Sequence, residues 1–163
     1  MTPIANRRAI LRHMANVPSA EALDRLGALL TPQHGRRRKE RTSLSLVPLV
    51  RGGLRYKVLE SVIRYASLSI EDVSGALDVA RRTLDRRKVD GRLDAGTSEK
   101  VVRLARVATR AEVVLGSVDA MRTWLRTQNR ALGHVAPLSL LDTDLGTDAV
   151  LDVLGRLEHG VYS

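Results

Sequence analysis

The chain has 163 residues, with 27 Lys and Arg against 18 Asp and Glu and a formal net charge of +9. Hydrophobic residues make up 44%, enough for a folded core, which must be aliphatic because there is no Phe and only one Trp. The lack of Cys excludes disulfides and thiolate metal sites, and no apolar run or signal segment indicates a membrane or secreted protein, so we expect a cytoplasmic location.

Apolar residues recur with helical spacing, and no stretch alternates as a half-buried strand would. The first helix is predicted after a cap at Ser19, and residues 32–43 predict a break. Within that break, the basic loop 35–41 is either a solvated charge run or an arm that contacts phosphates. We assign residues 1–50 to an N-terminal helical segment, with dimerisation as one candidate role. The apolar face of its helix consists of Leu23, Leu26 and Leu30.

The same spacing predicts six further helices after the boundary at Gly52-Gly53. Four of them are expected up to Tyr65, from the cap Ser69 to about Leu77, from Ala80 or Arg81 to about Lys88, and from a cap at Thr97 through Leu115. The last two are expected from Ser117 through Leu125 and from Thr147-Asp148 onward, with a loop at 129–137 between them. The fold class is therefore predicted to be all-α.

Residues 69–88 have the format of a helix-turn-helix, two short helices joined by three or four residues. Val79 and Leu84 are expected to fill the core between the helices. Asp78 occupies a turn position where Gly is usual, and Asp tolerates left-handed backbone better than most residues.

The second helix of this unit presents a basic face. Arg81 and Arg82 stand at its N-terminus, where the helix dipole disfavours cations by roughly 0.3–1 kcal/mol each. Local stability does not explain them, whereas a DNA groove lined by phosphates does. The predicted DNA contacts are Arg81, Arg82, Thr83, Arg86, Arg87 and Lys88, with Arg87 and Lys88 on the backbone. The alternative is an ordinary helical core with a solvated basic face.

The charge is unevenly distributed. Residues 1–110 carry 23 basic and 11 acidic residues, a net charge of +12, whereas residues 111–163 carry 4 and 7, a net charge of −3. Scarce aromatic residues argue against stacking on single strands, so the basic part favours duplex DNA. The acidic part indicates a second, different partner.

The C-terminal residues carry a family resemblance. Residues 111–163 include Trp124-Leu125, Leu132-Gly133, Pro137-Leu138-Ser139-Leu140-Leu141 and the closing run Leu157-Glu158-His159-Gly160-Val161-Tyr162-Ser163. This order closely resembles the toxin-binding domain of the Xre/MbcA/ParS family of type II antitoxins. Residues 54–107, with Arg81-Arg82-Thr83-Leu84 and Arg103-Leu104-Ala105-Arg106-Val107, resemble the Xre-type helix-turn-helix of the same family.

The resemblance implies a DNA-binding domain at 51–110 and a toxin-binding domain at 111–163, and it does not cover residues 1–50. It implies a bacterial antitoxin that blocks the active site of a RES-domain, NAD-consuming toxin and represses its own operon by binding operator DNA, as a homodimer or a larger toxin–antitoxin oligomer. The implied toxin-binding residues are Trp124, Leu132, Pro137, Leu140, Arg156, Glu158, His159, Gly160, Val161, Tyr162 and Ser163.

Two roles are separated among these residues. Trp124, Leu132 and Leu140 are expected to support the domain, since a lone Trp on a helix is commonly a core residue. Tyr162 and Ser163 are expected to enter or cap the toxin cleft, where cationic groups for a dinucleotide would meet the terminal carboxylate. The alternative for this tail is a frayed chain end.

The sequence contains no catalytic constellation. Its four His are far apart, no Gly-rich phosphate loop follows a strand, and no Ser or Thr has a persuasive base. We therefore expect no enzyme, no cofactor and no metal. The competing interpretation is a helix-turn-helix transcriptional regulator whose C-terminal domain only dimerises.

Overall fold

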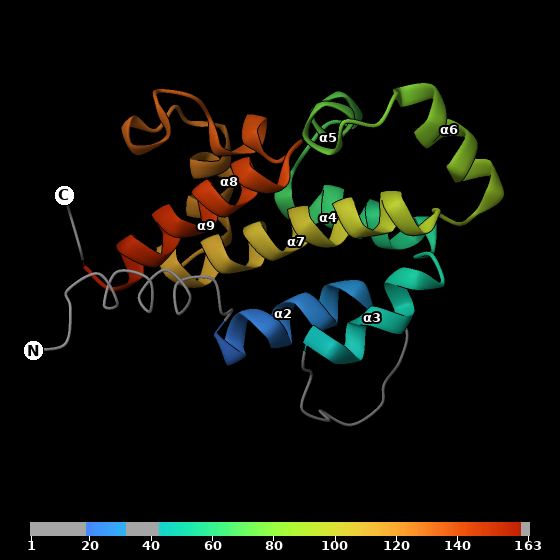
Figure 1. Cartoon of the computed structure of the whole chain (residues 1–163), viewed down its shortest axis with the longest axis horizontal. Helices are drawn as coiled ribbons and strands as arrows, with labels where there is room; N and C mark the ends of the chain where they lie inside the picture. Colours follow the sequence, from blue (N-terminus) through green and yellow to red (C-terminus); the bar gives the residue numbers. More distant parts are fainter. Residues whose placement is uncertain (1–18, 32–42, 161–163) are drawn as a thin grey trace, which may run out of the picture.

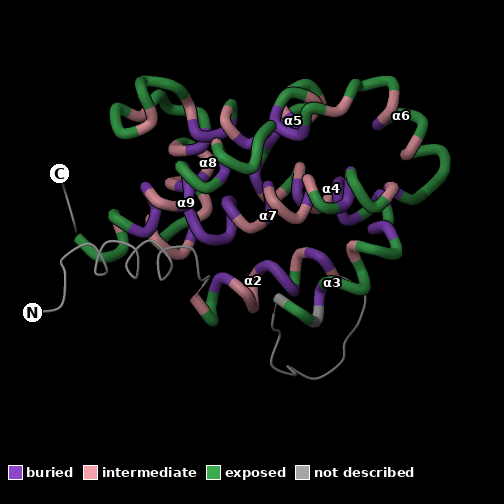
Figure 2. Tube along the Cα trace, viewed as in Figure 1, coloured by how far each residue is buried: buried purple, intermediate pink, exposed green. Residues whose placement is uncertain are grey.

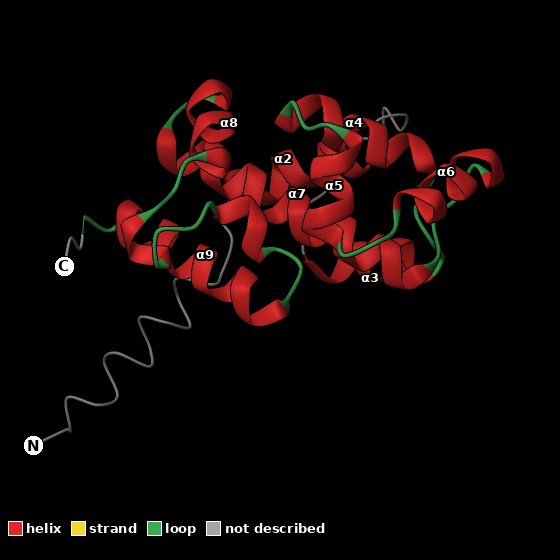
Figure 3. Ribbon diagram, turned by 90° about the horizontal axis from the view of Figure 1, so that it is seen from above, coloured by secondary structure: helices red, strands yellow, loops and turns green. Residues whose placement is uncertain are grey.

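The computed structural model describes residues 19–31 and 43–160, and these confirm an all-α fold. Figure 3 shows helices and loops and no strand among the described residues, whose only β-type pairings are two isolated bridges. The elements are α2 (Ala20–Leu30), α3 (Ser43–Arg51), α4 (Tyr56–Ala66), α5 (Ile70–Leu77), α6 (Arg81–Asp90), α7 (Ala95–Leu115), α8 (Val118–Arg126), the 3₁₀ helices η1 (Arg130–Leu132) and η2 (Pro137–Leu140), and α9 (Asp144–Glu158). None of the helices in these ranges is both long and apolar enough to cross a membrane.

The 21-residue helix α7 is the centre of the fold (Figure 1). It contacts α2, α3, α4 and α5 as well as α8 and α9. The stripe predicted for it is buried, with Val101, Leu104, Ala105 and Ala108 all at 0% exposure. Because α7 runs across residue 110 without a break, the helix-turn-helix and the C-terminal helices pack on one shared core.

Burial differs strongly between the helices (Figure 2). α7, α4 and α9 bury their inner faces, whereas α6 buries only Leu84. Leu84 is therefore the one side chain that α6 buries in the apolar core, and most of the surface of that helix is left to solvent.

Three predicted caps are confirmed. The Ser19 and Ser117 hydroxyls accept from the backbone N–H groups of Ala22 at 3.2 Å and Ala120 at 3.1 Å. Ser69 forms a full capping box with Asp72, since each side chain accepts from the backbone of the other. These contacts satisfy N–H groups that the first turn of a helix leaves unpaired.

Two predicted helix starts are wrong. α7 is capped by Asp94, not Thr97, because the Asp94 carboxylate accepts from the Thr97 backbone N–H at 2.8 Å. α9 begins at Asp144 after the cap Thr143, ahead of the predicted start at Thr147-Asp148. Its first turn is largely exposed, so the apolar periodicity begins a turn later than the helix.

Helix α3 was not predicted, and it contains Pro48, a residue type that usually ends or kinks a helix when it lies inside one. α6 also extends two residues beyond the predicted end at Lys88. The loop predicted at 129–137 contains the short 3₁₀ helix η1. The Ala131 backbone N–H in η1 donates to the side-chain oxygen of Asn129 at 2.9 Å.

Candidate functional site

The helix-turn-helix is held by a short hydrogen-bonded turn. Asp78 ends α5 in the left-handed region at φ 45°, as its position in the turn predicted. The Val79 N–H donates to the Ser74 carbonyl at 3.1 Å, and the Ser74 hydroxyl donates to the Val79 carbonyl at 2.8 Å. With Leu84 fully buried, these contacts fix the angle at which α6 leaves α5.

Two of the six predicted DNA contacts are engaged within the fold. Arg81 pairs with Glu71 of α5 and lies 3.8 Å from Asp85. A local interaction therefore does account for Arg81, contrary to the expectation from the helix dipole. Arg87 is three-quarters buried and pairs with Asp94 at 3.0 Å and with Asp90 at 3.6 Å, so its guanidinium braces the start of α7.

The other basic residues of α6 face solvent. Arg82, Arg86 and Lys88 are exposed, and none forms an ion pair with another residue in the described ranges. Arg82 and Arg86 stand four residues apart and share one face of the helix. Thr83 is half-buried beside them. The structure thus leaves two arginines and a lysine available to a polyanion.

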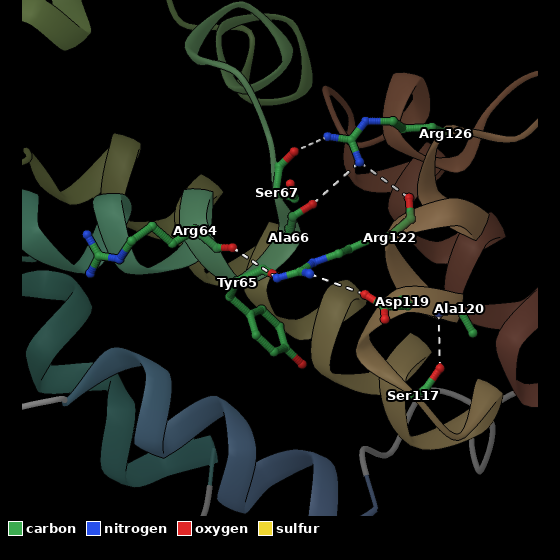
Figure 4. Close-up of polar contacts among 9 residues, drawn as sticks. All are labelled: Arg64, Tyr65, Ala66, Ser67, Ser117, Asp119, Ala120, Arg122 and Arg126. Atoms are coloured by element: carbon green, nitrogen blue, oxygen red, sulfur yellow. Dashed lines mark hydrogen bonds and ion pairs between the residues drawn. The ribbon is translucent and has the colours of Figure 1, made fainter.

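Two arginines of α8 join the C-terminal helices to the helix-turn-helix (Figure 4). Arg122 donates to the carbonyl oxygens of Tyr65 at 2.9 Å and Arg64 at 3.3 Å. Arg126 donates to the Ser67 carbonyl and lies 3.6 Å from Asp72, the carboxylate of the α5 capping box. The two side chains thus donate to carbonyls at and just beyond the end of α4, one of which, that of Arg64, also accepts from the Ser67 N–H at 3.3 Å.

A second polar junction joins three helices around Glu112 of α7. Its carboxylate, which is 10% exposed, accepts from Arg25 of α2 and from the Tyr65 hydroxyl of α4. Burial, reinforced by the hydrogen bond to Glu112, raises the pKa of Tyr65 above its ordinary range. The neutral phenol therefore stays a donor to this carboxylate.

The C-terminal helix α9 is pinned to α7 at both ends. Asp144, in its first turn, accepts from Arg103 at 2.6 Å, and Glu158, its last residue, pairs with the buried Arg110. These contacts set the direction in which the chain leaves α9. Gly160, just beyond the helix, has φ 65°, the left-handed geometry expected where a helix ends.

The predicted toxin-binding residues fall into three groups. Trp124, Leu132 and Leu140 are half-buried against the core, as the supporting role expected of these three requires, and Pro137 is buried. Arg156, His159 and Gly160 are exposed at the end of α9, whereas the Glu158 carboxylate is occupied by Arg110. Val161, Tyr162 and Ser163 lie outside the described residues, so their role stays a prediction.

Sequence reasoning missed the arginine contacts of α8 and the junction at Glu112. A signal was present for the first, because Arg122 and Arg126 are four residues apart beside the buried Met121 and Leu125. Cations in that register border the apolar stripe and can reach a neighbouring helix. No sequence signal points to the partners of Glu112, which lie 47 and 87 residues away.

Comparison with known proteins agrees with this arrangement. Residues 45–106 match the antitoxin Xre-like helix-turn-helix domain, and residues 110–160 match the antitoxin Xre/MbcA/ParS C-terminal toxin-binding domain. An Antitoxin Xre of Yersinia enterocolitica is 37% identical over 120 residues, which cover 72% of this chain and 81% of that protein. The chain belongs to the Xre family of antitoxins.

This Xre antitoxin is also similar to a second sequence relative and to one solved structure. An Antitoxin Xre of Photorhabdus laumondii is 29% identical over 113 residues, covering 68% of this chain and 76% of that protein. A chain of the crystal structure of the M. tuberculosis MbcT–MbcA toxin–antitoxin complex aligns with a TM-score of 0.51 and 21% identity. The alignment covers 66% of this chain and 96% of the other, which shows a shared fold.

Proposed function

We propose that this Xre antitoxin neutralises a RES-domain, NAD-consuming toxin by covering its active-site cleft, and that it represses its own operon through α6. One observation carries the proposal: helix α6 and the end of α9 lie at opposite ends of one body (Figures 1 and 3). The exposed cations of α6 stand at one end, and the end of α9 stands at the other. A single chain can therefore hold a protein and a DNA duplex without the two partners overlapping.

The toxin-facing end is built around the last turn of α9. The Arg103 and Arg110 ion pairs hold α9 rigidly on α7, so the exposed Arg156 and His159 are presented from a fixed position. We place the closing residues 161–163 in the toxin cleft, where groups that bind an NAD pyrophosphate would attract the terminal carboxylate.

Co-expression with the adjacent reading frame tests the neutralising activity. We expect that frame to arrest growth alone and to be rescued by this chain through a stable complex. A variant lacking residues 161–163, compared at equal abundance, should lose rescue. Rescue by the truncated chain would remove the tail from the mechanism, and a harmless neighbour would favour the regulator whose C-terminal domain only dimerises.

The repressor activity rests on α6. Replacing Arg82 and Arg86 with Ala should sharply lower affinity for the DNA upstream of the gene, because a well-placed arginine contributes about 1–3 kcal/mol of base discrimination. Arg64→Ala combined with Arg130→Ala, which removes two exposed charges outside α6, is the matched control and should bind normally. Equal binding by the α6 variant and the control in a gel-shift titration would contradict the assignment.

We also propose that the DNA-binding form is a dimer, with α3 at or near its interface. Leu44, Val47 and Leu49 of α3 are 80%, 36% and 42% exposed. A group of exposed aliphatic side chains on one short helix is typical of a surface that is covered in an assembly. The mass of the purified chain and of its toxin complex tests this, and a monomer at micromolar concentration would contradict it.

A further inference from the structure

A pocket lies between the ends of α2 and α3, the start of α4 and Arg92, which follows α6. Most of its lining is uncharged, and its open rim carries three cations. Its volume is about 310 Å³, and its charged lining residues are Arg55, Lys57 and Arg92. No acidic residue of the described ranges lines it. We propose that this pocket binds a phosphate of the duplex backbone beside the groove that α6 enters, an inference that rests on the proposed DNA-binding function.

The backbone places the three cations together. The Tyr56 N–H donates to the Gly91 carbonyl at 3.0 Å, and the Leu93 N–H donates to the Leu54 carbonyl at 2.8 Å. Arg55 and Arg92 thereby form an antiparallel bridge, although they are far apart in the chain. The Arg92 Nε–H donates to the Gly53 carbonyl at 3.1 Å, which holds this exposed residue at the pocket.

Local stability does not account for these charges. Arg55 is the N-cap of α4 and Lys57 lies in its first turn, where cations are disfavoured and where α4 has no acidic residue. All three side chains are exposed, and none has an ion pair with a described residue. Within residues 19–31 and 43–160, the three cations therefore have no anionic partner.

The position of the pocket selects the anion. α6 has ten residues and is therefore about 15 Å long, slightly more than the roughly 12 Å width of the major groove. When α6 lies in the groove, its C-terminal end reaches the bordering backbone, and the pocket is joined to that end through Gly91. A backbone phosphate of the same duplex then faces Arg55 and Lys57.

A second groove in the described part of the chain shows the contrast. It lies between α3, α7 and the start of α9 and has a volume of about 800 Å³. Its charged lining residues are the acids Glu99, Asp144 and Asp148 and the arginines Arg51, Arg103 and Arg106. Opposite charges balance there, so that groove does not favour a polyanion.

The test uses the full-length chain and two duplexes of equal length, one from upstream of its gene and one of random sequence. Arg55→Gln combined with Lys57→Gln should lower affinity for both duplexes on the order of tenfold to a hundredfold at 0.1 M salt. The slope of log K against log salt concentration should fall by about 1.8, because each lost phosphate contact contributes about 0.9. Arg55→Lys, which keeps the charge, should retain most of the slope.

Arg64→Gln combined with Arg130→Gln removes the same charge from exposed sites away from the pocket and is the matched control. Helicity and thermal midpoint, measured on both double variants, should equal those of the parent chain. If the parent chain binds the upstream duplex, and both double variants show the same slope of log K against log salt concentration as the parent, the pocket is not a phosphate site. If the parent binds neither duplex, the proposed repressor function fails as well.

Discussion

The Nε–H of Arg122 donates to the carbonyl oxygen of Tyr65 across 2.9 Å, which joins α8 to the last turn of α4 (Figure 4). The two residues are 57 positions apart. α8 lies in the region matched by the toxin-binding domain, and α4 in the region matched by the helix-turn-helix. The two regions are therefore connected by charge-assisted hydrogen bonds as well as by apolar packing.

Arg122→Ala should destabilise the chain by about 1–2 kcal/mol, because carbonyls of Arg64 and Tyr65 lose a charged donor that is partly shielded from solvent. Urea unfolding measures the loss, and hydrogen exchange should quicken first in α4 and α5. Arg130→Ala, a charge-matched change on η1, should leave both unchanged. An equal effect of the two variants would show that the contact contributes nothing beyond its charge.

Glu112→Ala should cost about 2 kcal/mol, since Arg25 and the Tyr65 hydroxyl both lose their acceptor. Tyr65→Phe removes only one donor and should cost about 1 kcal/mol. In a double-mutant cycle the two losses should be less than additive, because the hydroxyl has no role once the carboxylate is gone. Strict additivity would show that the two groups do not interact.

Asp94 predicts a pH dependence of stability. The Thr97 backbone N–H holds the pKa of Asp94 below its ordinary value of about 3.9. The folded state therefore binds this proton less readily than the unfolded state, and the stabilisation is complete above about pH 4 and is lost as the pH falls through the folded-state pKa.

Asp94→Asn keeps a capping oxygen but does not titrate, so its unfolding free energy should approach that of the parent chain as the pH is lowered. Asp94→Ala should cost about 1 kcal/mol at pH 7. Asp142→Asn, at an exposed carboxylate without a described hydrogen bond, is the control. A parent–Asn difference that stays constant from pH 6 to pH 2.5 would argue against this cause.

Gly146→Ala and Gly75→Ala should change stability in opposite directions. A Cβ at Gly146 would collide with the Leu140 carbonyl oxygen, so Ala should cost about 1–3 kcal/mol by separating η2 from α9. A Cβ at Gly75, inside α5, meets nothing within 4 Å, so Ala should add about 0.5–1 kcal/mol. Thermal midpoints compare the two, and a neutral Gly146→Ala would show that the approach of η2 to α9 is loose.

The sequence alone determined the features that depend on neighbouring residues. The helical spacing of apolar residues, together with cap and turn residues, was sufficient to predict α2, α4, α5 and α8. It also predicted the left-handed end of α5 at Asp78. The same local logic failed at α3, where Pro48 lies within the helix, and at the start of α9, whose first turn is largely exposed. The order of the motifs along the C-terminal sequence also indicated the antitoxin family.

Only the tertiary structure decided which charges are available to a partner. Arg81 and Arg82 are adjacent and alike in sequence, yet Arg81 is held by Glu71 while Arg82 faces solvent. Arg55 and Arg92 become neighbours only because the chain brings the start of α4 to the end of α6. Electrostatic pairing depends on distance in space, and for residues on different helices that distance is set by how the helices pack around α7.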